Sequence, residues 1–211
     1  MNDKVVWIDC EMTGLDLTKD TLVEVAVLVT DGELNVLGDG LDLIISTSEE
    51  KLAGMGDFVR TMHTTSGLLD EIRASTLTMR EAEQQVLAYV REWIPEAGKA
   101  PLAGNTIGTD RSFLALDMPE LESYLHYRNI DVSTIKELAR RWYPKTFYQA
   151  PAKLGHHRAL ADIQESIEEL TYYRATVFVP EPGPTSEQAH RAAQACQGSL
   201  TGLSPESAAD N

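Results

Sequence analysis

The chain has 211 residues, a net charge of −15, 43% hydrophobic residues and 24% charged residues. This composition is typical of a soluble globular protein, and the length suggests one domain, or one domain with an appendage. The acidic balance argues against broad binding to long nucleic acid, which requires many Lys and Arg contacts to phosphates. It does not exclude a small phosphorylated substrate held by a few residues and a metal ion.

The chain contains no apolar run that approaches the roughly 18 residues needed to cross a membrane. No charged segment followed by an apolar segment precedes the first expected strand, so a signal peptide is not expected. Cys10 lies within an acidic motif and Cys196 lies in a polar tail, so a disulfide framework is not expected either. We therefore expect a cytoplasmic protein without a membrane segment.

Three strand-like segments come first in the chain. Their residues are largely apolar and β-branched, which is typical of strands, and they cover residues 4–10, 21–30 and 41–46. Asp31 and Gly32 form a turn signal directly after the second segment. The short connections suggest that the sheet begins with antiparallel strands.

Helices then alternate with strands. The clearest helix has a capping box formed by Thr78 and Glu81 at its start and Pro95 just past its end. The first expected elements after the strands are short helices over 57–74 with a break at Ser66 and Gly67, a helix over 78–93 and a strand over 100–103. Helices over 109–115 and 118–127 and a strand over 128–132 follow. The last expected elements are a helix that Ser133 or Thr134 caps and that ends at Trp142, a loop over 151–155 and a long helix over 158–176. This order predicts an α/β fold, a mixed sheet flanked by helices.

The composition changes near the C-terminus. Pro180, Pro182 and Pro184 fall within five residues, and few large apolar side chains follow them. We therefore expect one domain over residues 1–179 and a mostly disordered tail over 180–211, in which residues 189–196 form a helical turn or two.

Two acidic residues end the first expected strand, in the stretch VVWIDCEMTGLD. Asp9 and Glu11 are two residues apart, so a strand places them on one face with Cβ atoms roughly 6–7 Å apart. At an effective dielectric constant of about 20 their charges repel by roughly 2.5 kcal/mol, and a bound divalent cation would reverse that sign. Taken alone, the pair can equally be a solvated polar face at a strand end.

Two further carboxylates and a histidine lie in other motifs. Asp110 follows a glycine loop in GNTIGTD and falls at the start of an expected helix, where the helix dipole alone would favour it. Asp162 lies inside the last helix, in GHHRALADI, but the apolar pattern does not settle whether it faces the core. His157 lies on the approach to that helix, where it suits a general base beside a metal site better than a metal ligand, and His156 competes for this role.

Together these residues form a set of four carboxylates and one histidine. Four carboxylates can hold two hard divalent ions and leave positions open for phosphate oxygens. Two such ions can stabilise the attacking and leaving oxygens of a phosphodiester, while the histidine deprotonates the attacking water.

The order of these motifs, D-x-E, then Asp, then H-x(4)-D, resembles the DEDDh family of 3′→5′ exonucleases, which has a ribonuclease-H-like fold. Within this family the chain is most similar to the oligoribonucleases. The resemblance rests on the blocks DCEMTGLD, GNTIGTDRSFL, YRNIDVSTIKEL and HRALADIQESI, so it covers almost all of the expected domain and none of the tail.

The resemblance implies a homodimeric exoribonuclease that cleaves very short oligoribonucleotides, dinucleotides above all, to mononucleotides. It implies that Asp9, Glu11, Asp110 and Asp162 bind two Mg²⁺ or Mn²⁺ ions and that His157 is the base. Linear pGpG becomes a candidate substrate, whereas a membrane or long nucleic acid is not expected as a partner.

The resemblance also implies a set of substrate contacts. Leu15 would wedge between the two bases, Phe58 would stack on a base, and His63 would lie near the substrate. A cap around the 5′ phosphate would use Thr106, Arg128, Ser133 and Thr134, with Tyr127 from a partner subunit. The family usually has Trp at the Phe58 position and commonly Ser at the Thr106 position, so stacking and cap fit are both altered here. Without the resemblance, Phe58 could be a core residue and Leu15 an ordinary exposed loop residue.

Two rival functions remain compatible with the sequence. A proofreading or tRNA-trimming exonuclease could carry the same residues and would degrade long single strands. A catalytically inactive relative could act as a binding or scaffold protein, although it would have no chemical need to keep all five residues. Asp131 also follows a strand, but Asp110 already occupies the corresponding place in the family pattern, so we do not expect Asp131 to bind metal.

Overall fold

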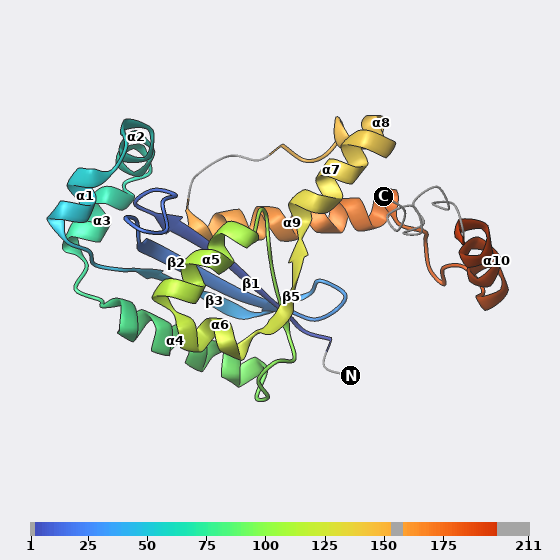
Figure 1. Cartoon of the computed structure of the whole chain (residues 1–211), viewed down its shortest axis with the longest axis horizontal. Helices are drawn as coiled ribbons and strands as arrows, with labels where there is room; N and C mark the ends of the chain where they lie inside the picture. The colour runs from blue at the N-terminus through green and yellow to red at the C-terminus, as the bar shows by residue number, and fades with distance from the viewer. Residues whose placement is uncertain (1–2, 153–157, 198–211) are drawn as a thin grey trace, which may run out of the picture. The chain divides into compact units, whose positions relative to one another are not determined.

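The computed structural model describes residues 3–152 and 158–197 of the chain. Five strands form one sheet in the order β3-β2-β1-β4-β5 (Figure 1). The pairs β1–β2 and β2–β3 are antiparallel, whereas β1–β4 and β4–β5 are parallel. The expected α/β fold with a mixed sheet and an antiparallel beginning is therefore confirmed.

The strands span Val5–Met12 (β1), Leu22–Thr30 (β2), Val36–Ile44 (β3), Pro101–Gly104 (β4) and His126–Asp131 (β5). β1 runs two residues further than expected, so Asp9 and Glu11 both lie within it. β3 begins five residues earlier than expected. The sequence obscured this start because Gly38 and Gly40, with φ of 74° and 80°, interrupt the β-branched pattern.

Three short helices follow β3 and lie together at one end of the sheet (Figure 1). They are α1 (Glu49–Gly54), α2 (Asp57–Thr65) and α3 (Leu68–Ala74). The predicted break between α2 and α3 is confirmed, and Gly67 there has a φ of 82°. α1 was not expected from the sequence, although the Ser48 side chain caps it by accepting a hydrogen bond from the Lys51 amide.

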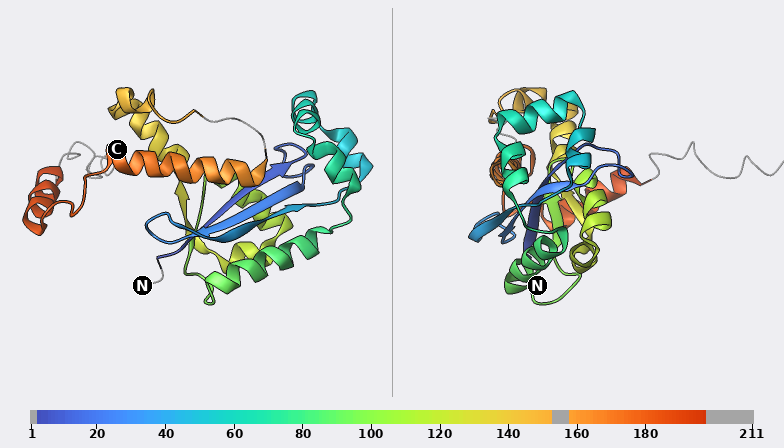
Figure 2. Two further views of the ribbon diagram at one scale, coloured as in Figure 1. Left: turned by 180° about the vertical axis from the view of Figure 1, so that it is seen from behind. Right: turned by 90° about the vertical axis from the view of Figure 1, so that its left-hand side faces the viewer.

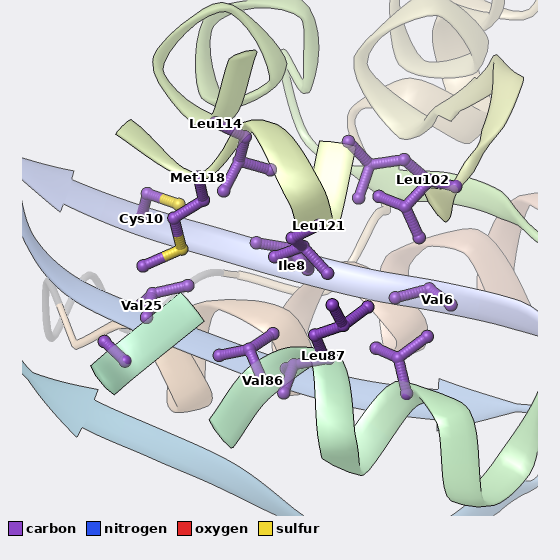
Figure 3. Close-up of a cluster of buried hydrophobic side chains, with 14 of the residues drawn as sticks. Val6, Ile8, Cys10, Val25, Val86, Leu87, Leu102, Leu114, Met118 and Leu121 are labelled. Carbon is purple, nitrogen blue, oxygen red and sulfur yellow. The ribbon is translucent and has the colours of Figure 1, made fainter. Parts of the chain in front are cut away.

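Helices α4 (Met79–Trp93), α5 (Gly108–Asp117) and α6 (Pro119–Tyr124) cover one face of the sheet (Figures 1 and 2). The predicted capping box of α4 is present, with both Thr78–Glu81 hydrogen bonds formed. Val6, Ile8 and Cys10 of β1 point toward Val86 of α4 and Leu121 of α6 in a buried cluster (Figure 3). Every second residue of β1 therefore belongs to this core.

The boundary between β5 and α7 (Val132–Trp142) differs from the prediction. The expected helix over 118–127 ends at Tyr124, because His126 already pairs with Pro101 of the parallel strand β4. The expected caps Ser133 and Thr134 are wrong, because Asp131 is the N-cap and its side chain accepts a hydrogen bond from the Ser133 amide at 2.9 Å. Pairing between strands distant in sequence decided this boundary.

The opposite face of the sheet is covered by α9 (Ala159–Val177), which the sequence predicted to within one residue at each end. Ala159, Ile163 and Ile167 pack there with Trp7 and Leu28 in a second buried cluster. A short helix, α8 (Pro144–Phe147), follows α7 and was not expected. Within residues 3–152 and 158–197, no helix has the length and apolar character needed to cross a membrane.

The chain from Val177 onward belongs to a separate unit, of which the structure describes residues 177–197. Its helix α10 (Ser186–Cys196) begins three residues before the expected turn or two and has a capping box between Thr185 and Gln188. The side chains of α10 are exposed. The proline residues before this helix and its lack of large apolar side chains left little signal for it in the sequence.

Candidate active site

The alternation of β1 places its two carboxylates on the face that α9 covers. Val5 and Trp7 belong to the core beneath α9, whereas Val6, Ile8 and Cys10 belong to the opposite core. Successive strand residues point to opposite faces, so Asp9 and Glu11 continue the row of Val5 and Trp7. Asp9 and Glu11 therefore share one face of β1, as expected. Helix α9 packs on this face, so it is not an open, solvated strand edge.

α9 brings a third carboxylate to this row. Asp9, Glu11 and Asp162 each offer an oxygen atom, and these atoms all lie within 4.8 Å of one another. Asp162 lies in the first turn of α9, one turn after the fully buried Ala159 and one turn before the buried Ser166. The structure thus settles the orientation that the sequence left open, because Asp162 lies on the side of α9 that faces the sheet.

Asp110 reaches the same region from the first turn of α5. Its Oδ1 atom accepts a hydrogen bond from the Cys10 amide at 3.1 Å, between the two acidic residues of β1. The pairing of β1 with β4 stops at Trp7 and Ala103, so this part of β1 is bonded by a side chain instead. Asp110 and Asp162 therefore both approach β1 from helix N-termini, where the helix dipole favours a carboxylate.

Burial, and then crowding by other carboxylates, raise the pKa values of Asp9, Glu11 and Asp110. Burial, and then the charges of Asp110 and Asp162, hold the pKa of Asp9 well above its ordinary value of 3.8. Burial, and then Glu24, raise the pKa of Glu11 to about 8, and burial raises the pKa of Asp110 to about 7. Such a group of buried acids with raised pKa values is typical of a site that accepts a cation.

His157, the predicted base, and its competitor His156 lie outside the described residues. Arg158 is the first described residue after them, and its side chain bonds Glu24 of β2 at 3.0 Å. Neither Arg158 nor Glu24 was among the residues predicted from the sequence to belong to the site. The signal that could have found Glu24 was a charged residue within the apolar run of β2, where it is fully buried.

The loop after β1 presents Leu15 to solvent, with 73% of its surface exposed. Asp20 holds this loop by accepting hydrogen bonds from the Thr13 hydroxyl at 2.9 Å and from the Asp16 amide at 2.9 Å. The Asp20 carboxylate lies so close to Gly14 that a Cβ atom there would be 2.4 Å from it. Gly14 is therefore needed for the close approach that shapes the loop around Leu15.

Phe58 and His63 lie on the same helix, α2, but in different environments. Phe58 is 79% exposed, so it is not a core residue. His63 is fully buried, with Nε2 2.8 Å from the Met12 carbonyl oxygen and Nδ1 4.0 Å from a Glu11 carboxylate oxygen. The histidine thus contacts the strand that carries the acidic residues.

Two of the residues expected in a phosphate cap meet at the carboxyl ends of β4 and β5. The hydroxyl oxygens of Thr106 and Ser133 lie 3.1 Å apart, and the Thr106 amide donates to Ser133 Oγ at 2.9 Å. Thr106 has a φ of 54°, which is rare for a β-branched residue. Asp131 supports the pair, because its Oδ1 accepts hydrogen bonds from the amides of both residues. Thr134 is exposed beside them.

Tyr127 and Arg128 lie near the other end of β5. The Arg128 guanidinium lies over the Tyr127 ring, 5.4 Å from its centroid, and Tyr127 is 73% exposed. Tyr127 lies four residues before Asp131 along β5, a rise of about 13 Å. Tyr127 is therefore at the opposite end of β5 from Ser133.

Comparison with known proteins decides the family. The sequence profile of the exonuclease family RNase_T matches residues 6–170. The chain is 65% identical over 198 residues to the oligoribonuclease of Cutibacterium acnes, which covers 94% of this chain and 98% of that relative. The chain belongs to the oligoribonuclease family of exonucleases. The oligoribonuclease of Mycobacterium avium is 57% identical, over 92% of this chain and 91% of its own.

Solved structures show the same fold at much lower identity. An exonuclease I structure has a TM-score of 0.65 at 14% identity and covers 82% of this chain and 41% of its own. The zinc-bound complex of Escherichia coli exonuclease I with single-stranded DNA has a TM-score of 0.67 at 13% identity, over 84% of this chain and 41% of its own. This chain therefore spans about two fifths of those longer proteins, and the likeness concerns the fold alone.

These comparisons confirm the expected class of enzyme and fold. Membership in the family makes the protein a 3′→5′ exoribonuclease, as the motif order indicated. The likeness to exonuclease I confirms the ribonuclease-H-like sheet with its flanking helices.

Proposed function

We propose that the protein hydrolyses very short oligoribonucleotides, dinucleotides above all, from the 3′ end to mononucleotides. The observation that carries this proposal is the cluster of Asp9, Glu11 and Asp162, whose oxygen atoms lie within 4.8 Å of one another in a chain of the oligoribonuclease family. We assign the activity to residues 1–179 and no catalytic role to the tail over 180–211.

The four carboxylates fit a pair of hard divalent cations. Asp9, Glu11, Asp110 and Asp162 supply only oxygen ligands, which Mg²⁺ and Mn²⁺ prefer. Burial, and then repulsion from neighbouring carboxylates, raise the pKa values of Asp9 and Glu11, so bound cations would relieve an existing electrostatic cost. Two such ions, when bound, stabilise the attacking and leaving oxygens of a phosphodiester.

The remaining chemistry falls to side chains of this chain. We assign His157 the role of general base, which takes a proton from the attacking water. His63 contacts the Met12 carbonyl oxygen through Nε2 and lies beside Glu11. We assign His63 the role of keeping the end of β1 in position near the substrate.

Two exposed apolar side chains suit the recognition of a dinucleotide. Leu15 and Phe58 project from the loop after β1 and from α2, and both are more than 70% exposed. Leu15 is proposed to wedge between the two bases and Phe58 to stack on one of them, which requires no particular base sequence. Because the chain carries a net charge of −15, a longer strand would meet repulsion beyond these contacts.

We propose that the 5′ phosphate is bound by a cap to which two subunits contribute. Thr106, Ser133 and Thr134 of one subunit supply hydroxyl groups at the carboxyl end of β5. Arg128 supplies the positive charge of this cap. Tyr127 lies about 13 Å from Asp131 along the strand, so we assign it to the cap of a partner subunit. The distance between the carboxylate cluster and such a cap would set the length of substrate that the site accepts.

A length series tests the substrate. The purified protein is incubated with Mn²⁺ and 5′-labelled RNAs of two to ten nucleotides, and kcat/KM is measured for each, with Asp162→Ala as the inactive control. We expect the highest value for the dinucleotide and a steep fall with length. Equal rates on long RNA would favour a trimming or proofreading exonuclease, and binding without turnover would favour a scaffold protein. Linear pGpG is included as one of the dinucleotides.

A further inference from the structure

We propose that Arg158 is a positioning residue for the carboxylate cluster, because it clamps the first turn of α9 onto β2 and α3 and so holds Asp162 against β1. This inference rests on the proposed metal-dependent function of Asp9, Glu11 and Asp162. It assigns a role in that site to three side chains that do not themselves belong to the cluster, Arg158, Glu24 and Glu71.

The backbone of Arg158 is bonded directly to Asp162. The Asp162 amide donates to the Arg158 carbonyl oxygen at 3.0 Å, in the first turn of α9. A helix end is the part of a helix that frays most readily, because its terminal groups lack intrahelical partners. A tether on Arg158 therefore restrains the turn from which the Asp162 carboxylate projects.

The side chain of Arg158 supplies this tether in two directions. Its Nε atom donates to Glu24 Oε1 at 3.0 Å. Its two terminal nitrogens bond the two oxygens of Glu71 at 3.2 and 2.9 Å, in the paired geometry that gives Arg–carboxylate contacts their strength. One guanidinium thus joins α9 to the sheet and to α3, and in Figures 1 and 2 α9 begins on the side of the sheet where α1 to α3 lie.

The hydrogen bond between Arg158 and Glu24 bears on the carboxylate cluster because Glu24 lies next to it on the sheet. Glu24 is fully buried on β2 and is the register partner of Glu11 on β1. Among the described residues, Arg158 is the cation that forms an ion pair with Glu24, and removing one partner of a buried pair leaves an uncompensated charge. Without Arg158, Glu24 would lose this ion pair while lying opposite Glu11, and the start of α9 would lose both side-chain tethers.

Arg174 provides a matched control on the same helix. It also forms an ion pair, with Glu33, and its side chain is 38% exposed compared with 30% for Arg158. Arg174 lies about three turns along α9 from Asp162, so its pair cannot orient the first turn. The variants Arg158→Gln and Arg174→Gln therefore make the same chemical change near the cluster and far from it.

The test measures binding of Mn²⁺ alone, by electron paramagnetic resonance and calorimetry, together with kcat and KM for a dinucleotide at several Mn²⁺ concentrations. Residues that orient metal ligands typically change metal affinity by about 10–100-fold when they are replaced. We expect Arg158→Gln to weaken Mn²⁺ binding by roughly tenfold or more and to lower kcat at a fixed low Mn²⁺ concentration. The KM for the dinucleotide should change little, and Arg174→Gln should behave as the unaltered protein.

Two milder variants keep the test decisive if Arg158→Gln does not fold. Arg158→Lys keeps the charge but cannot make the paired contact, and Glu71→Gln removes only the partner nearer the surface. Both should weaken Mn²⁺ binding by less than Arg158→Gln would. Unchanged Mn²⁺ affinity in the folded Arg158 variants would overturn the inference. Absence of Mn²⁺ binding in the unaltered protein would instead overturn the proposed function, so the two failures are distinguishable.

Discussion

Glu11 and Glu24 are register partners on the antiparallel strands β1 and β2, and both side chains are buried, with 9% and 0% of their surfaces exposed. Directly opposed like charges destabilise an antiparallel pair of strands. The structure tolerates this arrangement because Arg158 forms an ion pair with Glu24, and because burial, followed by the charge of Glu24, raises the pKa of Glu11 to about 8, so that Glu11 holds its proton near neutral pH. Electrostatic interactions of buried side chains, and not apolar packing alone, therefore decide the stability of this part of the sheet.

Neutralisation of Asp162 should weaken metal binding and lower turnover. Asp162→Asn preserves the size of the side chain but removes one of the three anionic groups within 4.8 Å of one another. We expect Mn²⁺ affinity to fall at least tenfold and kcat to fall by at least about a hundredfold, because the cluster loses a charge and a ligand. The matched control is Asp131→Asn, which alters the cap of α7 and should keep Mn²⁺ affinity. Equal Mn²⁺ affinity in the two variants would contradict the assignment.

The thermal stability of the metal-free protein should fall as the pH rises from about 5 to 8.5. The pKa of Glu11 is raised from 4.5 to about 8 and that of Asp110 from 3.8 to about 7, chiefly by burial. The folded protein therefore retains protons that the unfolded chain releases. This contribution to stability is complete below the ordinary pKa values and is lost as the pH rises through the raised values.

The measurement is the Tm of metal-free protein across this pH range, with and without Mg²⁺. Each kcal/mol lost should lower Tm by about 2–4 °C in a chain of this size. Added Mg²⁺ should raise Tm more at pH 8.5 than at pH 5.5, since the cation binds the ionised carboxylates. A Tm that stays constant over the range, or a Mg²⁺ effect that is larger at pH 5.5, would contradict the prediction.

Replacement of the two neighbouring histidines should have unequal effects. His157→Ala is expected to lose most activity, by about 10²–10⁴-fold in kcat, because a general base contributes on that scale. His156→Ala should retain activity close to that of the unaltered protein. Steady-state kinetics on one dinucleotide compares the two, and comparable losses would show that His157 is not the base.

Phe58 should contribute to substrate affinity without contributing to stability. Its side chain is 79% exposed, so Phe58→Ala should leave Tm nearly unchanged. Stacking of a base on an aromatic ring is worth about 1–3 kcal/mol, so kcat/KM for a dinucleotide should fall by roughly 5- to 150-fold. Phe58→Trp should raise it, because the larger ring covers more of the base. A Phe58→Ala variant with unaltered kinetics would rule out stacking.

Ser133 should discriminate dinucleotides by their 5′ end. Ser133 Oγ lies 3.1 Å from the Thr106 hydroxyl, so both hydroxyls face one spot. Hydrogen bonds to charged groups are worth about 1.5–3 kcal/mol, so Ser133→Ala should lower kcat/KM for a 5′-phosphorylated dinucleotide about tenfold or more. The same variant should change little with a 5′-hydroxyl dinucleotide. An equal loss on both substrates would place Ser133 outside the phosphate cap.

The sequence predicted those parts of the fold that depend on neighbours along the chain. The capping box of Thr78 and Glu81 is local, so α4 was predicted correctly. The shared face of Asp9 and Glu11 follows from the strand period, and the motif order was sufficient to indicate the exonuclease family. Elements with weak local signals, such as α1 and α10, were missed or shortened.

The tertiary structure decided the features that depend on residues far apart in sequence. The orientation of Asp162 could not be read from the pattern of α9, because it depends on how the helix lies on the sheet. Arg158 and Glu24 are 134 residues apart, and no spacing rule connects them. The sequence by itself determined which chemical groups are present and which family they indicate. Only the packing of α9 on β1 and β2 determined which of those groups meet, since contacts between distant segments are set by the whole core.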